Sequence, residues 1–355
     1  MESNLYRCSP RRTKKFAMDC LYAGLVPYVQ SSPGMGKSAI MRAIAKELNL
    51  FLIDHRLSTS PPEDLSGLPY FKDGKAYFAP FGELFPVKGT ELPKKYDDAG
   101  NVIGQYDGWL VFLDEFPSAK KDTQAAAYKL ILDKMVGQHD LHELVLLAAA
   151  GNLATDRAIV NPIGTAMQSR VIHIEMQISF DEWLYDVALK EGYDGRIVSF
   201  LSQHQSKLMD FRPDHNDRTF ACPRTWEFMN KFLADKPVVV DDDTALFAGT
   251  IGSGIACEFV QFTKVFNSLV RFEDIVADPL NCTLPANKDI QWATISIMMD
   301  RVNDKNFDKV TQYVDRFSSD FRILFYRSIL VRHPHLRESK AFQGAMSSLS
   351  QYLHG

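Results

Sequence analysis

A glycine-rich octapeptide, SSPGMGKS, occupies residues 31–38. A nucleoside triphosphate needs backbone N–H donors at a helix start, room for the backbone to approach, and a cation. Gly34 and Gly36 supply the permissive backbone. Lys37 supplies a contact to the β- and γ-phosphates, and Ser38 supplies a hydroxyl ligand for Mg²⁺. We therefore predict a site for ATP and Mg²⁺ whose loop contacts come from Pro33, Gly34, Met35, Gly36, Lys37, Ser38 and Ala39.

Ser31 departs from the phosphate-loop pattern G-x-x-x-x-G-K-[ST], which begins with glycine. A serine there costs about 1 kcal/mol if the backbone φ is positive and almost nothing otherwise. Taken alone, the octapeptide is open to three interpretations: a working nucleotide site, a decayed one, or a chance grouping of glycines. The residues further along the chain favour a working site.

Two adjacent carboxylates, Asp114 and Glu115, follow the apolar run WLVFL at residues 109–113. A buried parallel strand would present them at its carboxyl end, where such sheets bind ligands. We predict that Asp114, with Ser38, holds the metal and its water shell. Glu115 would polarise the attacking water, a role that a hydrolase needs and a simple binding module does not.

Three further polar residues complete the predicted catalytic set of Lys37, Glu115, Asn152, Arg170 and Arg224. Asn152 follows another apolar run and could orient the attacking water; an asparagine in a plain turn is the alternative. Arg170 precedes the fifth predicted strand, and we expect it on the same sheet edge as the phosphate loop. It suits a finger that acts on a neighbouring subunit's nucleotide. Arg224 opens a later helix and could reach back to the γ-phosphate.

The elements that must position these residues alternate between strands and helices, which is typical of an α/β domain. Short apolar runs predict strands at residues 25–30, 51–56, 110–113, 144–149 and 171–175. Helical periodicity predicts helices at 38–48 and at 122–135, the second capped by Asp122. Residues 57–108 form an irregular insertion with one hairpin whose turn is Asp73-Gly74. Beyond about residue 176 only helices are predicted.

The ordered set SSPGMGKS, FLDE, AAAGN, SRV and CPRTWE resembles the AAA+ ATPases, specifically their MoxR-like branch, over about residues 15–270. The stretch EDLSGLP at residues 63–69 is similar to the D-L-x-G-x-P segment of that branch. By this resemblance Asn152 stands at sensor 1, Arg224 at sensor 2, and Arg170 is the arginine finger. Arg157 is a second intersubunit candidate.

The resemblance also implies a fold and an assembly. The fold is a P-loop AAA+ core with a five-stranded parallel sheet in the order 5-1-4-3-2, followed by an α-helical lid and a helical C-terminal extension. We place these domains at residues 1–176, 177–275 and 276–355. The implied protein is a homo-oligomeric ring, typically a hexamer, that uses ATP hydrolysis for chaperone-like remodelling of a protein client. Its partners would include a von Willebrand factor A-domain protein, and its hairpin insertion would lie near the ring's pore or upper face.

Composition limits the alternatives. Apolar residues make up 46% of the 355 residues and charged residues 24%, ordinary values for a globular protein with a core. The net charge of -4 gives no general case for nucleic acid or an anionic membrane, apart from the basic run at residues 11–15. No apolar run approaches the ~18 residues of a membrane helix. Five cysteines without C-x-x-C spacing are typical of reduced thiols, so we expect a cytoplasmic protein with no membrane partner.

Two other functions stay open at this stage. One is a nucleic-acid motor of the kind that serves restriction systems, with GTP as its nucleotide. DNA-stimulated turnover would favour it, whereas the near-neutral charge opposes it. The other is a nucleotide-gated scaffold that binds a partner without productive hydrolysis, which an intact Glu115 opposes. A P-loop kinase is disfavoured by the water-activating Glu115 and by the two arginines.

Overall fold

The computed structural model describes residues 6–82, 84–156, 161, 163–214, 217–266 and 271–353. The chain forms two compact units. The first comprises Met1–Ile178 with Arg212–Asp214, and the second comprises Ser179–Phe211 with His215–Gly355. Among the helices in the described ranges, none combines the length and the apolar character needed to cross a membrane.

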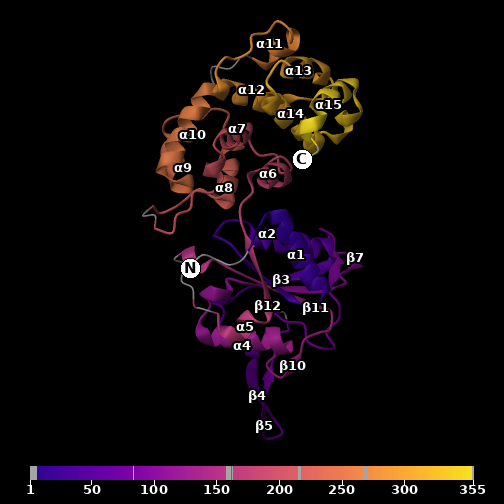
Figure 1. Cartoon of the computed structure of the whole chain (residues 1–355). Helices are drawn as coiled ribbons and strands as arrows, with labels where there is room; N and C mark the ends of the chain where they lie inside the picture. The colour runs from indigo at the N-terminus through magenta and orange to yellow at the C-terminus, as the bar shows by residue number, and fades with distance from the viewer. Residues whose placement is uncertain are drawn as a thin grey trace. The chain divides into compact units, whose positions relative to one another are not determined.

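A parallel sheet forms the centre of the first unit (Figure 1). It has six strands in the order β1-β12-β2-β11-β8-β3. The α/β fold class is therefore confirmed, and the five predicted strands stand in the predicted order. The six strands are β1 (Arg7–Cys8), β2 (Val26–Gln30), β3 (Leu50–Arg56), β8 (Gly108–Asp114), β11 (Val145–Gly151) and β12 (Val171–Met176).

Helices cover both faces of this sheet (Figure 1). Helices α1 (Pro10–Tyr22) and α2 (Lys37–Glu47) pack against each other and against one face. Helix α4 (Lys121–Asp133) and the short α5 (Thr165–Gln168) lie on the other. All seven residues of β8 are buried, because a strand inside a sheet with two covered faces meets apolar side chains on both sides.

The sixth strand, β1, is an addition to the prediction. It has two residues and pairs with β12 at the sheet edge, where Arg7 Nε lies 2.8 Å from the buried Glu175 carboxylate. A strand this short has no periodic pattern, so the sequence offers no signal for it.

The predicted cap of α4 is wrong. Asp122 lies in the first turn of α4, and the N-cap is Lys120, which makes no side-chain capping bond.

The insertion between β3 and β8 carries two hairpins. Strands β4 (Leu68–Lys72) and β5 (Lys75–Ala79) pair around the predicted Asp73-Gly74 turn, with φ values of 51° and 72°. This hairpin projects away from the sheet in Figure 1. The same segment contains η1 (Leu57–Thr59), α3 (Pro62–Ser66), β6 (Lys94–Tyr96) and β7 (Val102–Gln105), and a further two-residue pair, β9 (Met135–Val136) with β10 (His139–Asp140), follows α4.

The described part of the second unit contains helices and no strand, as predicted for the chain beyond residue 176. The longer helices are α7 (Gly195–Gln203), α8 (Pro223–Leu233), α9 (Asp243–Ile251), α10 (Ser253–Phe266), α12 (Lys288–Arg301), α13 (Phe307–Val314), α14 (Ser319–Arg332) and α15 (Lys340–Leu353). Shorter helices are α6 (Phe180–Trp183), η4 (Leu184–Ala188), η5 (Gln205–Leu208), α11 (Phe272–Ala277) and η6 (Pro334–Glu338).

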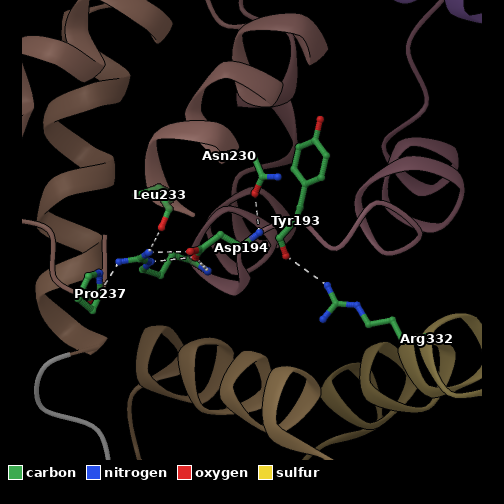
Figure 2. A network of polar contacts seen from close by, with 7 residues as sticks. Tyr193, Asp194, Asn230, Leu233, Pro237 and Arg332 are labelled. Atoms are coloured by element: carbon green, nitrogen blue, oxygen red, sulfur yellow. Dashed lines mark hydrogen bonds and ion pairs between the residues drawn. The ribbon is translucent and has the colours of Figure 1, made fainter. Parts of the chain in front are cut away.

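A polar network joins helices that are far apart in sequence within this unit (Figure 2). The backbone N–H of Asp194 donates to Asn230 Oδ1 on α8 at 2.7 Å, and the Asp194 carboxylate caps α7. Arg332, at the end of α14, donates to the carbonyl oxygen of Tyr193 at 3.2 Å and to Asp300 on α12 at 2.7 Å. These bonds attach α12 and α14 to the start of α7. The predicted boundary between lid and extension at residue 275 stays a prediction.

Candidate nucleotide site

The phosphate loop joins β2 to α2 at the carboxyl edge of the sheet. Gly34 and Gly36 have φ values of 77° and 88°, and Gly36 is the N-cap of α2. A Cβ atom at Gly36 would meet no heavy atom closer than 4.0 Å, so the left-handed backbone, rather than a lack of space, favours glycine there. The loop therefore ends at a helix N-terminus, where backbone N–H groups and the helix dipole favour an anion.

Lys37 turns back onto this loop. Its ammonium nitrogen donates to the Ser31 carbonyl oxygen at 3.0 Å, to the Ser32 carbonyl oxygen at 3.3 Å and to Asn152 Oδ1 at 2.9 Å. Oxygen atoms thus surround the cation, and phosphate oxygens can replace them. The contact with Asn152 also brings together two predicted catalytic residues that are 115 positions apart.

The predicted metal residues meet directly. Ser38 Oγ on α2 donates to Asp114 Oδ2 at the end of β8, at 2.9 Å. Asp114 is buried, and its other oxygen accepts from the backbone N–H of Glu115 at 2.8 Å. A hydroxyl and a carboxylate held together are the oxygen ligands that Mg²⁺ prefers, so this pair fits the ion.

Glu115 has an uncommon backbone. Its φ of 56° and ψ of 32° are left-handed, a conformation that costs a non-glycine residue free energy and that tends to occur at functional sites. This turn directs the chain from β8 into η2 (Phe116–Ser118). The Glu115 carboxylate accepts a hydrogen bond from Ser58 Oγ. Ser58 lies just after β3, and no sequence pattern distinguishes it from the other serines of the irregular insertion.

Asn152 directly follows β11, which pairs with both β2 and β8. Steric contacts require a glycine at the preceding position, Gly151. A Cβ atom at Gly151 would lie 2.3 Å from Pro117 Cδ and 2.7 Å from the Tyr28 hydroxyl oxygen. Because residue 151 is glycine, the end of β11 can lie close to Pro117. Asn152, the next residue, then lies within hydrogen-bonding distance of Lys37.

A buried acid next to the loop was missed by the sequence reasoning. Asp156 Oδ1 accepts from Ser32 Oγ at 3.3 Å, and Oδ2 is buried with no hydrogen-bond partner among the described residues. Burial raises the pKa of Asp156, while the Ser32 hydrogen bond and the nearby charge of Lys37 act in the opposite direction. Asp156 thus ties the loop to η3 (Ala154–Asp156), just beyond Asn152.

The arginines lie elsewhere. Arg170 is exposed in the turn before β12, and β12 runs parallel to β2 from Val171 to Met176. Arg170 is therefore at the amino edge of the sheet, opposite the phosphate loop, and the expectation of a shared edge is wrong. The error has a simple cause: residues that precede a parallel strand lie at the opposite edge from residues that follow one.

The structure does not relate the other two arginines, Arg224 and Arg157, to this site. Arg224 is the second residue of α8 in the second unit, after the N-cap Cys222. Arg157 lies outside the described residues. Their catalytic roles stay predictions.

A parallel sheet, a glycine loop leading into α2, and a hydroxyl–carboxylate pair at the neighbouring strand end together define a P-loop α/β fold. No protein-family model matches the sequence, and no curated protein matches it significantly. The solved structures that it resembles include a mutant of Thermotoga maritima RuvB, with 17% identity, a TM-score of 0.36, and coverage of 78% of this chain and 80% of that one.

Two other solved structures give similar values. The Thermotoga maritima RuvB Holliday junction branch migration motor has 15% identity and a TM-score of 0.35, with coverage of 74% of this chain and 76% of that one. A DNA polymerase III gamma subunit-related protein from Thermotoga maritima has 11% identity and a TM-score of 0.33, with coverage of 98% and 92%. Scores of this size do not establish a relationship.

Proposed function

We propose that the protein is a Mg²⁺-dependent ATP hydrolase of the AAA+ class. One observation carries the proposal: the cation Lys37, the Ser38–Asp114 pair, the strained Glu115 and the amide of Asn152 come together at the carboxyl edge of one sheet. A protein that only binds nucleotide needs Lys37 and the Ser38–Asp114 pair. A hydrolase also needs a carboxylate next to that pair, and Glu115 supplies it.

Each of these residues has a separate role in the proposed hydrolysis. The backbone N–H groups of the loop and Lys37 bind the phosphates and neutralise their charge. Ser38 and Asp114 would hold Mg²⁺, which when bound would supply positive charge to the phosphates. Glu115 orients the attacking water and accepts its proton, for which the hydrogen bond from Ser58 must loosen. Asn152, already in contact with Lys37, positions the γ-phosphate side of the site.

The proposal extends to a MoxR-like ring. The ordered motifs of the sequence support it, as does Arg170, which is exposed at the sheet edge opposite its own phosphate loop. An arginine in that position suits a finger on a neighbouring subunit better than a role in its own site. Arg224 would act as the sensor of the lid, with Arg157 as a second intersubunit candidate.

A protein is the client that we propose, together with a partner that carries a von Willebrand factor A domain. The projecting β4–β5 hairpin supports a protein contact, because Phe71 near its tip is 83% exposed and Tyr70 is 41% exposed. Aromatic side chains of this kind are enriched in protein interfaces. The basic run at residues 11–15 is the feature that would suit a nucleic-acid track, and the net charge of -4 opposes that alternative.

The test is turnover by purified protein with and without Mg²⁺. We expect hydrolysis of ATP that requires Mg²⁺, and loss of turnover of about 10²-fold or more in Glu115→Gln with retained ATP binding. Glu91→Gln, an exposed acid of the insertion, is the matched control and should keep full activity. Tight ATP binding without turnover in the unaltered protein would instead indicate the scaffold function.

A further inference from the structure

Arg56, the last residue of β3, lies beside the proposed metal pair at the carboxyl edge of the sheet. In the parallel pairing of β3 with β8, Arg56 is the direct partner of Asp114. Neighbouring strands lie about 4.8 Å apart, and residues paired in register present their side chains on the same face of the sheet. Asp114 faces α2, where it accepts from Ser38. Arg56 is therefore also on the α2 face, one strand away from Asp114.

The residue two positions before Arg56 gives the same direction. Asp54 Oδ2 lies 3.9 Å from Arg42 Nη1 on α2. Side chains alternate along a strand with a period of two, and Arg56 has an extended backbone with φ of -91° and ψ of 105°. Asp54 and Arg56 thus share the face that α2 covers. Burial and the charge of Asp114 raise the pKa of Asp54, and Arg56 lies close enough to act in the opposite direction.

The guanidinium group of Arg56 is open to a ligand. Arg56 is exposed, and its side chain forms no hydrogen bond and no ion pair with any residue in the part of the chain that the structure describes. The acids near it have other partners: Asp54 faces Arg42, and Glu115 accepts from Ser58. A guanidinium carries N–H donors in a planar fork that matches the oxygens of a phosphate group.

We propose that Arg56 binds the γ-phosphate of ATP in its own subunit. The inference rests on the proposed nucleotide site. In the sheet order β2-β11-β8-β3, Asn152 follows β11 and Arg56 ends β3, so the two residues lie on opposite sides of Asp114. Lys37 contacts Asn152, so Lys37 and Arg56 supply positive charge on both sides of the Ser38–Asp114 pair. Cations fixed in this way stabilise the charge on a transferred phosphoryl group.

An arginine that contacts the γ-phosphate has a signature that a structural arginine lacks. Its loss weakens the binding of a nucleoside triphosphate and leaves the binding of a diphosphate unchanged, because ADP has no group at this position. An arginine that only balances the nearby acids Asp54, Asp114 and Glu115 would change the two affinities together. The ratio of the two dissociation constants therefore separates these roles.

The experiment measures, by calorimetry with Mg²⁺ present, the dissociation constants of ADP and of the non-hydrolysable ATP analogue AMP-PNP. Arg56→Ala should weaken AMP-PNP binding by about tenfold and keep ADP affinity within about twofold, since hydrogen bonds to charged groups are stronger than those between neutral groups. Arg56→Lys keeps the charge but loses the fork, so its loss should be smaller. Lys46→Ala, which removes an exposed cation from the last turn of α2, is the control and should change neither affinity.

Equal losses of AMP-PNP and ADP affinity in Arg56→Ala, or no loss of either, would overturn the proposal. If Arg56→Ala does not fold, the same ratio measured in Arg56→Lys decides between the two roles. A protein that shows the expected ratio but does not hydrolyse ATP would refute the proposed hydrolysis alone. An active ATP hydrolase whose Arg56→Ala variant binds both nucleotides normally would refute the role of Arg56 alone.

Discussion

Ser31 replaces the first glycine of the phosphate-loop pattern without strain. The non-glycine residues with positive φ that the structure describes are Asn49, Asp73, Glu115 and Lys134. Ser31 is not among them, so its Cβ atom carries no left-handed penalty. The residue is fully buried, its N–H donates to the Gly151 carbonyl oxygen, and its hydroxyl accepts from Lys37 at 3.2 Å. The substitution therefore adds a contact to the loop and removes none.

Ser58 is the residue whose removal should raise activity. Its hydroxyl donates a hydrogen bond to Glu115 Oε2. This hydrogen bond competes with the attacking water for the proposed base, Glu115. Loss of one hydrogen bond is worth about 1 kcal/mol, so Ser58→Ala should raise basal ATP turnover about fivefold at saturating ATP. Thr59→Ala, an exposed neighbour whose hydroxyl donates to the Arg56 carbonyl oxygen at 3.2 Å, is the control. A decrease in Ser58→Ala would mean that this serine positions the base rather than restrains it.

Asp156 should make stability depend on pH. Because burial raises its pKa in the folded protein, the folded state holds this proton at pH values where the unfolded chain has lost it. At pH values above the pKa of Asp156 in the folded protein, the ionised carboxylate therefore lowers the free energy of unfolding. This penalty disappears as the pH falls below 3.8, the ordinary pKa of an aspartate. Asp156→Asn keeps the acceptor for Ser32 and should raise the unfolding temperature by a few degrees at pH 7.5.

The gain in Asp156→Asn should shrink toward zero near pH 4 when thermal unfolding is followed over a pH series. Asp98→Asn removes one negative charge at an exposed position of the same unit and accounts for the change in net charge. A stabilisation of Asp156→Asn that is the same at pH 7.5 and pH 4 would contradict the assignment. The charges that act on Asp156 are those of Lys37 and Glu175.

At the scale of elements, β11 and η2 approach so closely that the strand end must be glycine. Gly151→Ala would place a methyl group 2.5 Å from Pro117 Cγ and 2.7 Å from the Tyr28 hydroxyl. Overpacking of this kind costs about 1–3 kcal/mol, and relief by a shift of β11 would also move Asn152 away from Lys37. We expect both lower stability in urea unfolding and weaker ATP binding.

Gly82→Ala is the matched control, because a Cβ atom there meets no heavy atom within 4 Å. It should change stability by no more than about 1 kcal/mol, in the favourable direction, through the entropy of the unfolded chain. If Gly151→Ala behaves like Gly82→Ala, the close contact with Pro117 does not constrain the strand.

At the scale of the whole molecule, the position of Arg170 predicts that activity depends on assembly. An exposed arginine at the amino edge of the sheet can serve a nucleotide only in another subunit. If the protein assembles into the proposed ring, specific ATPase activity should therefore rise with protein concentration. Arg170→Ala should lower turnover by about 10³-fold, the low end of the contribution of such fingers, while ATP affinity stays within about twofold.

Sedimentation of Arg170→Ala at the assay concentration separates loss of the proposed finger from loss of the proposed assembly. Arg7→Ala, which removes an exposed arginine bonded to Glu175 at the edge of the same sheet, is the matched variant and should keep its turnover. Full activity of an assembled Arg170→Ala protein would show that another residue, such as Arg157, acts between subunits.

The local sequence by itself determined the α/β class, the positions of the five central strands and the identity of the loop. Apolar runs such as that in β8 are long enough to predict a buried strand, and glycines before Lys37 predict a phosphate loop from residue type alone. Asp114 and Glu115 were predictable for the same reason, since they directly follow such a run.

Only the tertiary structure decided which side chains meet across long sequence separations. The contacts of Ser58 with Glu115 and of Asp156 with Ser32 join segments separated by 57 and 124 positions, and no local pattern records them. The edge at which Arg170 lies, the pairing of β1 and the place of Arg56 beside Asp114 depend in the same way on strand direction and packing. These features arise when the sheet assembles, because packing brings together groups whose own sequences carry no sign of one another.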